Sequence, residues 1–406
     1  MESNIMSQPS QDQGIPSRRR CYRFSSQRIW RSIKAVIFSS KINVLIPFGP
    51  VAIVVHYVHN HGSVFFLSLL GIIPLAERLG FATEQLSLFT GPTVGALLNA
   101  SFGNATELII SIQAMRNGML RIVQQSLLGS VLSNMLLVLG CALFAGGIRH
   151  KNKVQIFNER DAGLNSGMLM VALMGMLSPT VLHYTNTEIQ SGKSELVLSR
   201  FTSCLLLLAY AAYLFYQIKY QPTDPSSNQE EIQNEEKEEA VLVSKWECIT
   251  WLVVFTVSIS VLSDYLVDAI EGASRSWNIP IAFISVVLLP IVGNAAEHAG
   301  AIMFAINDKL DISLGVALGS ATQISMFLRP LCVLIGWVMG KTMDLNFKLF
   351  ETAVLFLTVV LVAFMLQDGT SNYLKGLLLV ICYFVVAASF YVHVDATSAD
   401  NKLPQG

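Results

Sequence analysis

Long apolar runs separated by short polar breaks dominate this chain. Each run is long enough to cross the roughly 30 Å hydrocarbon layer of a bilayer as a helix. Eleven runs can be counted, covering residues 42–60, 63–80, 87–115, 122–147, 162–183, 196–218, 246–270, 278–306, 312–338, 347–367 and 373–393. The pattern therefore predicts an all-α polytopic membrane protein with eleven transmembrane helices.

The composition agrees with this prediction. Of the 406 residues, 52% are hydrophobic and only 14% are charged, and the mean hydropathy is +0.52. A soluble chain carries roughly 25% charged residues, so a soluble enzyme is excluded. The formal net charge of −1 gives no reason to expect a nucleic-acid partner. The expected surroundings are a lipid bilayer, and the sequence leaves open whether the chain forms homo- or hetero-oligomers.

Charge gathers in segments outside the apolar runs. Residues 1–41 hold eight Arg and Lys side chains, and Arg149, Lys151, Lys153 and Arg160 form a second basic cluster. In an eleven-span count, both basic segments lie on the same side of the membrane, so the positive-inside rule predicts a cytosolic N-terminus.

An acidic segment lies between the two halves of the chain, since residues 221–245 hold six Glu around Lys237. This segment is predicted to be a solvated cytosolic linker, or alternatively a tract that concentrates cations near the pore mouth.

An internal repeat relates the two halves of the chain. At an offset of 190 residues, 11 of the 28 positions from Gly103 to Ser130 are identical to those from Gly293 to Ser320. The repeated Glu residues fall in the third and eighth spans, so five crossings separate them. An odd number of crossings reverses the orientation of a helix, which predicts inverted-topology repeats with a substrate site where the halves meet.

The repeat defines the expected organisation of the chain. The predicted parts are a basic cytosolic tail (1–41), a first transmembrane helix (42–62), a first five-helix repeat (63–220), the acidic linker (221–245), a second five-helix repeat (246–395) and a C-terminal tail (396–406).

Glu107 and Glu297 are the residues that point to chemistry. A charged side chain at the middle of a membrane costs about 2.5 to 3.5 kcal/mol on insertion scales, so such residues are functional by default. Asn104 and Asn294 each precede a Glu by three positions, which places the amide and the carboxylate on one helix face. The alternative of two protonated structural carboxyls is less favoured.

The spans that follow add weaker oxygen ligands at i, i+3 spacing. These are Ser130 and Ser133 in the fourth span, and Ser320 and Gln323 in the ninth. A cage made only of oxygen donors with two carboxylates suits Ca²⁺, and Mn²⁺ fits the same set. His298 lies about 100° round the helix from Glu297, so we expect it in a second shell or at a gate. No cofactor is predicted; Ca²⁺ and H⁺ are the expected substrates.

The same pair of carboxylates suggests a mechanism. Two carboxylates that face each other in a low-dielectric site cannot both stay ionised without a cation. The site should therefore hold either a divalent cation or protons, and their titration belongs to the pair. Alternating access would turn this exclusive occupancy into exchange.

These motifs resemble those of the cation/proton exchanger family, and particularly its plant vacuolar members. The resemblance rests on GNATELIIS (103–111), SLLGSVLSN (126–134), GNAAEHAGAI (293–302) and ISLGVALGSATQIS (312–325). It implies eleven spans, an acidic segment between the halves, and H⁺-coupled movement of Ca²⁺, and often Mn²⁺, from cytosol into the vacuole. It also implies a cytosolic N-terminal tail that can restrain transport, a place that residues 1–41 occupy here, although charge bias explains their arginines equally well.

One residue departs from this resemblance. Arg329 lies inside the ninth span, about 180° from Ser320 on an ideal helix, so it should face away from the site and needs a partner. It leaves a transport-inactive regulatory homologue as an alternative. A Na⁺-coupled Ca²⁺ exchanger is a second alternative. An intramembrane enzyme is not favoured, since no HExxH or GxSxG motif is present.

Overall fold

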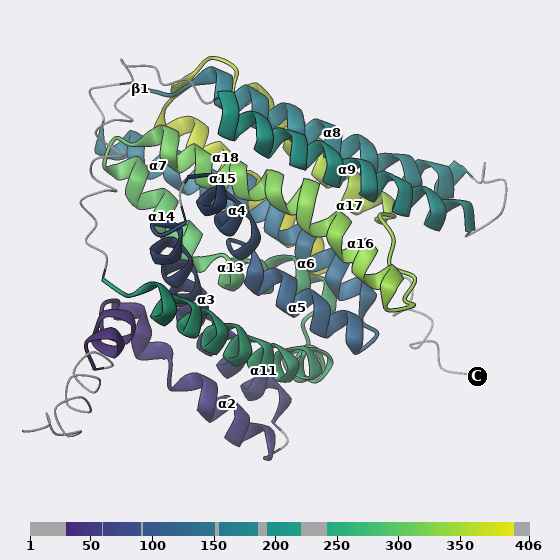
Figure 1. Ribbon diagram of the computed structural model, residues 1–406. Coiled ribbons are helices and arrows are strands. Elements are labelled where there is room, and N and C mark those ends of the chain that lie inside the picture. The colour runs from purple at the N-terminus through teal and green to yellow at the C-terminus, as the bar shows by residue number, and fades with distance from the viewer. Residues whose placement is uncertain are drawn as a thin grey trace, which may run out of the picture.

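The computed structural model describes residues 30–58, 60–90, 92–150, 154–185, 193–220 and 242–393. The basic tail before residue 30, most of the acidic linker and the C-terminal tail lie outside the described residues, so their predicted roles remain predictions. Helices make up almost all of the described chain (Figure 1).

Eight helices within the described residues are long and apolar enough to cross a membrane. They are α3 (His61–Ser87), the continuous α6, η2 and α7 (Leu120–Arg149), α8 (Glu159–Thr185), α9 (Lys193–Tyr220), α11 (Lys245–Trp277), the continuous α15, η4 and α16 (Leu310–Val338), α17 (Leu349–Leu366) and α18 (Tyr373–Val392). Two bent helix pairs raise the count of candidate spans in this part of the chain to as many as ten.

Three of the predicted runs are not single straight helices. The run 42–60 contains η1 (Lys41–Leu45) and α2 (Phe48–His56), and the chain from Lys41 to His56 is bent by 94° from a helix at Trp30–Ile37. The run 87–115 is divided into α4 (Pro92–Phe102) and α5 (Ala105–Arg116). Pro47 separates η1 from α2, and the Gly103-Asn104 step separates α4 from α5, because each interrupts the helical hydrogen-bond ladder. The 94° bend falls instead at residues 38–40, which contain neither proline nor glycine.

The third divided run, 278–306, has the same kind of break. It consists of α12 (Ile281–Phe283), η3 (Ile284–Leu288), α13 (Leu289–Gly293) and α14 (Ala295–Ile306), with a bend of 58° before α14. The bend falls at Asn294, directly after Gly293. The break in the first half falls at the equivalent Gly103 and Asn104, so the repeat in sequence is also a repeat in backbone structure.

The predicted all-α architecture is confirmed in general, and one short strand pair is added to it. Strands β1 (Gln155–Ile156) and β2 (Thr370–Ser371) pair antiparallel. Two-residue strands carry too little pattern to be detected in sequence. The Gln155 side chain donates to Asp308 at 2.9 Å, and the Asn158 amide donates to Asp311 at 2.7 Å. These contacts gather the start of α8 and the start of α15 at one end of the helix bundle.

The opposite end of the bundle is held by residues 339–348, which connect α16 to α17. The Phe347 amide donates to Thr180 near the end of α8 at 3.3 Å, and Gln124 near the start of α6 donates to Asp344 at 2.8 Å. Because α8 has 27 residues, about 40 Å separate its two ends. Helix α6 therefore begins at the end of the bundle opposite to that at which α15 begins.

Two π-helical segments occupy related places in the repeat. Segment η2 (Ser133–Val138) follows α6 (Leu120–Leu132) and precedes α7 (Leu139–Arg149), and η4 (Ile324–Leu328) follows α15 (Leu310–Gln323) and precedes α16 (Arg329–Val338). Segment η3 is also π-helical. A π-helical turn inserts an extra residue into the ladder and re-aims the side chains around it, and such turns are frequent at functional sites.

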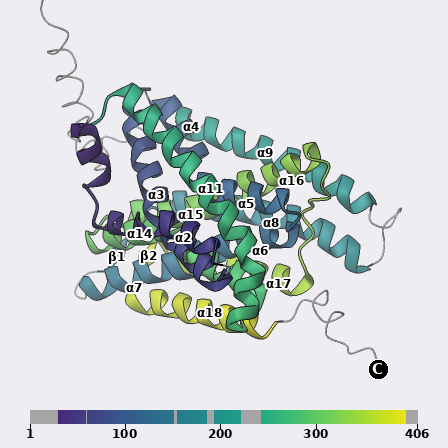
Figure 2. The same cartoon turned by 90° about the horizontal axis from the view of Figure 1, so that it is seen from below.

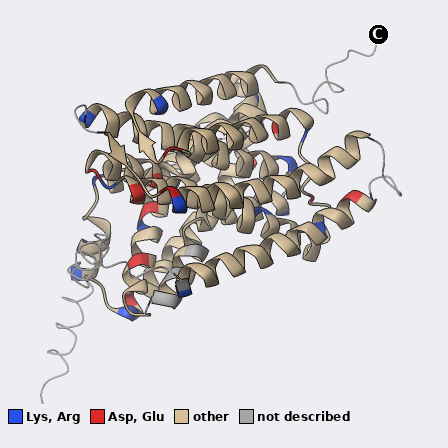
Figure 3. Cartoon of the chain, turned by 90° about the horizontal axis from the view of Figure 1, so that it is seen from above, with Lys and Arg blue, Asp and Glu red and all other residues tan. Residues whose placement is uncertain are grey.

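The helices form layers around the two breaks. Helices α8 and α9 run side by side along one edge, whereas α11, α3 and α2 cover the opposite edge (Figures 1 and 2). Charged residues are sparse along the helices (Figure 3), and apolar side chains such as Phe201 and Leu208 on α9 are more than 60% exposed. An outward apolar surface of this kind is typical of a chain surrounded by lipid.

A close helix contact at Gly129 provides a test of this packing. A Cβ atom at Gly129 would lie 2.1 Å from the carbonyl oxygen of Val286 in η3, whereas one at Gly163 would meet nothing within 4 Å. We expect Gly129→Ala to destabilise the protein by about 1 to 3 kcal/mol, because α6 must move away from η3. Thermal unfolding of purified protein measures this, with Gly163→Ala as the matched control. Equal Tm values for Gly129→Ala and wild type would contradict the packing.

Candidate functional site

The two helix breaks present equivalent residues. Asn104 and Asn294 are the N-cap residues of α5 and α14, with closely similar backbone angles (φ −109° and −98°), and neither side chain caps its own helix. Glu107 and Glu297 lie in the first turns. Unsatisfied N–H groups give a helix N-terminus partial positive charge. Each break therefore favours an ionised carboxylate while leaving an amide side chain available.

Each break also lies against a polar side chain from the other repeat. The Glu107 Oε1 atom lies 3.7 Å from where a Cβ would stand at Gly293, and the Gln323 Nε2 atom lies 3.8 Å from the equivalent point at Gly103. Glycine at both positions leaves room for this approach. The Glu107 and Glu297 carboxylates are close enough to repel each other electrostatically.

Hydrogen bonds connect the two halves of the site. The Asn134 side chain donates to Ser320 Oγ at 2.9 Å, and Ser320 Oγ donates to Asn104 Oδ1 at 3.4 Å. Ser320 and Asn134 also lie near the Glu297 carboxyl. Polar groups from the start of α5, from η2, from α14 and from α15 thus lie close together.

His298 lies at the edge of this group. Its Nε2 atom is 3.3 Å from Ser133 Oγ, so it contacts a predicted ligand across the repeats. Ser130 is buried one turn before Ser133, but it makes none of these hydrogen bonds. His298, Glu107 and Glu297 are half-buried as whole residues, whereas Oε2 of Glu297 is itself buried.

Several buried polar atoms of the site have no hydrogen-bond partner among the described residues. They are both side-chain polar atoms of Asn294, Oε2 of Glu297 and Oδ1 of Asn134. A buried polar atom left without a partner costs about 1 to 3 kcal/mol. Three of these four atoms are oxygens, which is the donor type that a hard divalent cation binds. No group of three or more His, Cys, Asp or Glu forms a metal site among the described residues, so carboxylates alone could not complete the shell.

Asn134 is the residue that the sequence analysis missed. It is fully buried, and it lies four positions after Ser130, on the same helix face. The repeat could not identify it, because Ile324 occupies the equivalent position. The signal that the sequence did contain was an amide side chain in an otherwise apolar span.

The structure therefore brings together most of the predicted set. Cross-repeat contacts join Glu107, Asn104, Ser320, Gln323, Ser133 and His298, and Glu297 lies within electrostatic range of Glu107, whereas Asn294 and Ser130 are buried nearby without a side-chain hydrogen bond among those described. The roles of these residues as ligands or gate remain predictions.

Arg329 has partners for part of its guanidinium, whereas its buried Nε has none among the described residues. Its guanidinium donates to the Leu127 carbonyl at 3.1 Å and to Met176, and it lies 4.9 Å over the ring of Phe347. These partners belong to α6, α8 and the 339–348 connection, away from the two breaks. Arg329 therefore connects helices around the site.

Comparison with known proteins decides the family. The model of the sodium/calcium exchanger protein family matches residues 61–219 and 248–392. The chain belongs to this family. Vacuolar cation/proton exchanger 2 of Oryza sativa subsp. japonica is 63% identical over 380 residues, covering 93% of this chain and 87% of the relative. Vacuolar cation/proton exchanger 2 of Arabidopsis thaliana is 61% identical over 400 residues, covering 97% and 90%.

Solved structures show the same architecture. The structure of native YfkE matches with a TM-score of 0.73 and 33% identity, over 87% of this chain and 100% of YfkE. A second solved structure of YfkE names that protein a Ca²⁺/H⁺ antiporter. The H⁺/Ca²⁺ exchanger CAX matches with a TM-score of 0.65 over 90% of this chain and 93% of its own, at 12% identity, which supports the fold alone. The resemblance noted in the motifs is thus confirmed at the level of the family.

The hydrogen bond between Asn134 and Ser320 can be tested separately from the carboxylates. We expect Asn134→Leu to weaken cation binding by up to about tenfold, because a hydrogen bond between neutral groups contributes about 0.5 to 1.5 kcal/mol. Titration of purified protein with Ca²⁺ gives the dissociation constant. Thr322→Val is the control, because this buried neighbour bonds to the Asn165 carbonyl instead. Unchanged affinity in Asn134→Leu would show that Asn134 plays no part in binding.

Proposed function

We propose that this protein is a secondary active antiporter that moves Ca²⁺ from the cytosol into the vacuole in exchange for protons. The observation that carries the proposal is that Glu107 and Glu297, from equivalent breaks in the two repeats, face a common polar site. The names of the vacuolar cation/proton exchanger relatives and of the Ca²⁺/H⁺ antiporter YfkE support the same substrates.

In the cation-bound state, the two carboxylates balance the charge of one divalent ion. Neutral oxygens from Asn104, Asn294, Ser320 and Asn134 add to the coordination, which for Ca²⁺ needs six to eight oxygens. Ser130, Ser133 and Gln323 lie on the same helices as further donors. Mn²⁺ accepts the same ligands, so we include it as a second substrate.

In the cation-free state, the same carboxylates take up protons. Two adjacent negative charges in a low-dielectric site cost several kcal/mol unless a counter-charge neutralises them. Protonation removes this cost, so an empty and fully ionised site is the state that the protein avoids. Exchange follows, because the site changes its accessible side only when it carries a cation or protons.

The repeat layout provides the change of access. We infer eleven crossings, with one N-terminal helix and two inverted five-helix repeats. The opposite directions of α6 and α15 support this layout, as do the matching breaks and π-helical segments. The broken helices give the site its hinges and free backbone groups, as in other transporters with inverted repeats. His298, which contacts Ser133, is placed to act as a gate residue between the repeats.

The orientation follows from charge. The basic residues before the first span place the N-terminus in the cytosol, and the end of the bundle that contains β1 and β2 is then cytosolic. The end held by residues 339–348 faces the vacuolar lumen. A multi-pass location in the vacuolar membrane agrees with the names of the relatives.

Substitution of the two carboxylates tests the proposal. We expect Glu107→Gln and Glu297→Gln each to reduce uptake of radioactive Ca²⁺ into vesicles with an acidic interior by at least about tenfold, because each removes one counter-charge and one proton carrier. The control is Glu271→Gln, which removes only an exposed ion pair with Arg275.

The same vesicles separate the alternatives. Uptake that persists after the pH gradient collapses but requires a Na⁺ gradient would identify a Na⁺-coupled exchanger. Absence of uptake in wild type despite a maintained pH gradient would favour a transport-inactive regulator. Normal uptake in both Gln variants would contradict the assigned site.

A further inference from the structure

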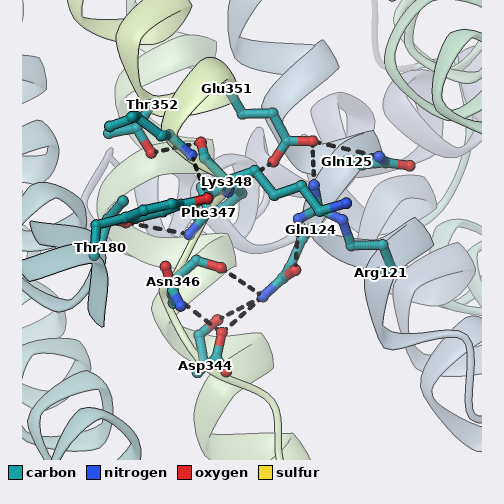
Figure 4. Close-up of polar contacts among 12 residues, drawn as sticks. Arg121, Gln124, Gln125, Thr180, Asp344, Asn346, Phe347, Lys348, Glu351 and Thr352 are labelled. Carbon is teal, nitrogen blue, oxygen red and sulfur yellow. Dashed lines mark hydrogen bonds and ion pairs between the residues drawn. The ribbon is translucent and has the colours of Figure 1, made fainter. Parts of the chain in front are cut away.

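A second polar cluster lies at the end of the bundle opposite β1 and β2, outside the site described above. It is built on residues 339–348, here called the strap, which connect α16 to α17 (Figure 4). The cluster joins the strap to the starts of α6, α9 and α17 and to the end of α8. Nothing in the exchange mechanism above uses it.

Gln124 is the main contact between α6 and the strap. Its Nε2 atom donates to the Asp344 carboxylate at 2.8 Å and to the Asn346 carbonyl at 3.2 Å (Figure 4). Arg121 donates to Gln124 Oε1 at 3.0 Å. This bond fixes the orientation of the amide, so that its N–H groups point toward the strap.

Glu351 ties the same part of α6 to α17. Its carboxyl is fully buried, forms an ion pair with Arg121, and accepts a hydrogen bond from Gln125 at 3.3 Å (Figure 4). It also accepts from the Lys348 backbone amide at 3.3 Å, at the start of its own helix. A buried carboxylate is stable only when paired and hydrogen-bonded in this way.

The strap is also fixed to the neighbouring helices by its backbone. The Leu345 amide donates to Ser199 of α9 at 3.2 Å, and the Phe347 amide donates to Thr180 of α8 at 3.3 Å. Opening of the strap would break both bonds, which makes these two amides direct reporters of its state.

Charged groups surround Asp344 on several sides. Glu195 of α9, which is buried and paired with His183 of α8 at 2.9 Å, lies on one side of Asp344. Arg121 of α6 lies on another side. Glu351 and Lys348 lie on the α17 side, and the Arg329 guanidinium stacks on Phe347 from α16. Burial, followed by the charge of Glu195, raises the pKa of Asp344 to about 6, although bonds from Asn346 and Gln124 act in the opposite direction.

We propose that Gln124 and Asp344 are positioning residues, which hold the start of α6 through the strap and hold it more firmly when the surrounding compartment is acidic. Helix α6 carries Ser130, and η2, which continues α6, carries Ser133 and Asn134 into the proposed cation site. Gln124 precedes Ser130 by six residues, about 9 Å along the helix. Movement at the strap is therefore transmitted through a short rigid segment to the ligands.

The sign of the pH effect follows from linkage. The closed strap binds a proton on Asp344 more readily than an open strap with an ordinary carboxyl would. Closure is therefore favoured below the ordinary pKa of about 4 and weakens as the pH rises to about 6. Between about pH 7.5 and about pH 5.5, the closing equilibrium should increase about fourfold. With the orientation proposed above, the acidic compartment is the vacuolar lumen.

Hydrogen exchange on the reconstituted full chain tests the strap directly. We expect the protection of the Leu345 and Phe347 amides, corrected for intrinsic rates, to be about fourfold higher at pH 5.5 than at pH 7.5. Asp344→Asn keeps the acceptor oxygen without the charge, so its protection should not change between the two pH values. Gln124→Leu should lower the protection of these amides at both pH values.

Asp368→Asn is the matched control. Asp368 lies near the opposite end of the bundle, and its hydrogen bond with Lys375 lowers its pKa to about 2, so it is ionised at both pH values. In Asp368→Asn, the protection of the Leu345 and Phe347 amides should still be about fourfold higher at pH 5.5 than at pH 7.5. Equal protection at the two pH values in wild type, or a fourfold difference that persists in Asp344→Asn, would overturn the proposal.

Transport kinetics test the positioning role. With both compartments shifted in pH together, so that the gradient stays constant, the KM for Ca²⁺ in Asp344→Asn should lose the pH dependence contributed by the strap. Its maximal rate should stay within about twofold of wild type. An altered protection ratio with a wild-type KM profile would show that the strap does not position α6. This inference rests on the proposed function, but absence of uptake in wild type would overturn that function without affecting the hydrogen-exchange result.

Discussion

Two like charges placed together in a medium of low polarity need a counter-charge, and this constraint organises the molecule. Glu107 and Glu297 lie close together at the interface of the repeats, where two ionised carboxylates would repel each other. In the proposed function, a divalent cation or protons relieve the repulsion, and the two cannot do so together. The helix N-termini, the amide side chains and the hydroxyl groups around the carboxylates would favour the proposed cation-bound state, while the surrounding apolar helices would make the empty state costly.

The fold serves this constraint by breaking helices at matching places. Each Gly-Asn step ends one helix and begins another, so a carboxylate, an N-cap amide and a helix N-terminus reach the same point from each repeat. Glycine at both steps lets a side chain of the opposite repeat approach to less than 4 Å of the Cβ position. The segments η2 and η4 then redirect the helices that carry the remaining polar groups.

Much of this could be predicted from sequence because apolar length and repetition are strong signals. The repeat identified the Glu and Asn pairs, and the motifs identified the family. Asn134 was missed because its equivalent in the other repeat is Ile324. The bonds of Arg329 to Leu127 and Met176, and that of Gln124 to Asp344, join residues that are more than 150 positions apart, and periodicity within one span contains no information on such contacts. The bend near Ser40 and the two-residue strands depend on local turns that hydropathy does not register.

The most direct test of the central claim is the Ca²⁺ affinity of the purified protein at equilibrium, measured across a range of pH without any gradient. If cation and protons compete for one pair of carboxylates, the affinity should rise with pH and each bound Ca²⁺ should release between one and about two protons. An affinity independent of pH, with no proton release, would contradict the account.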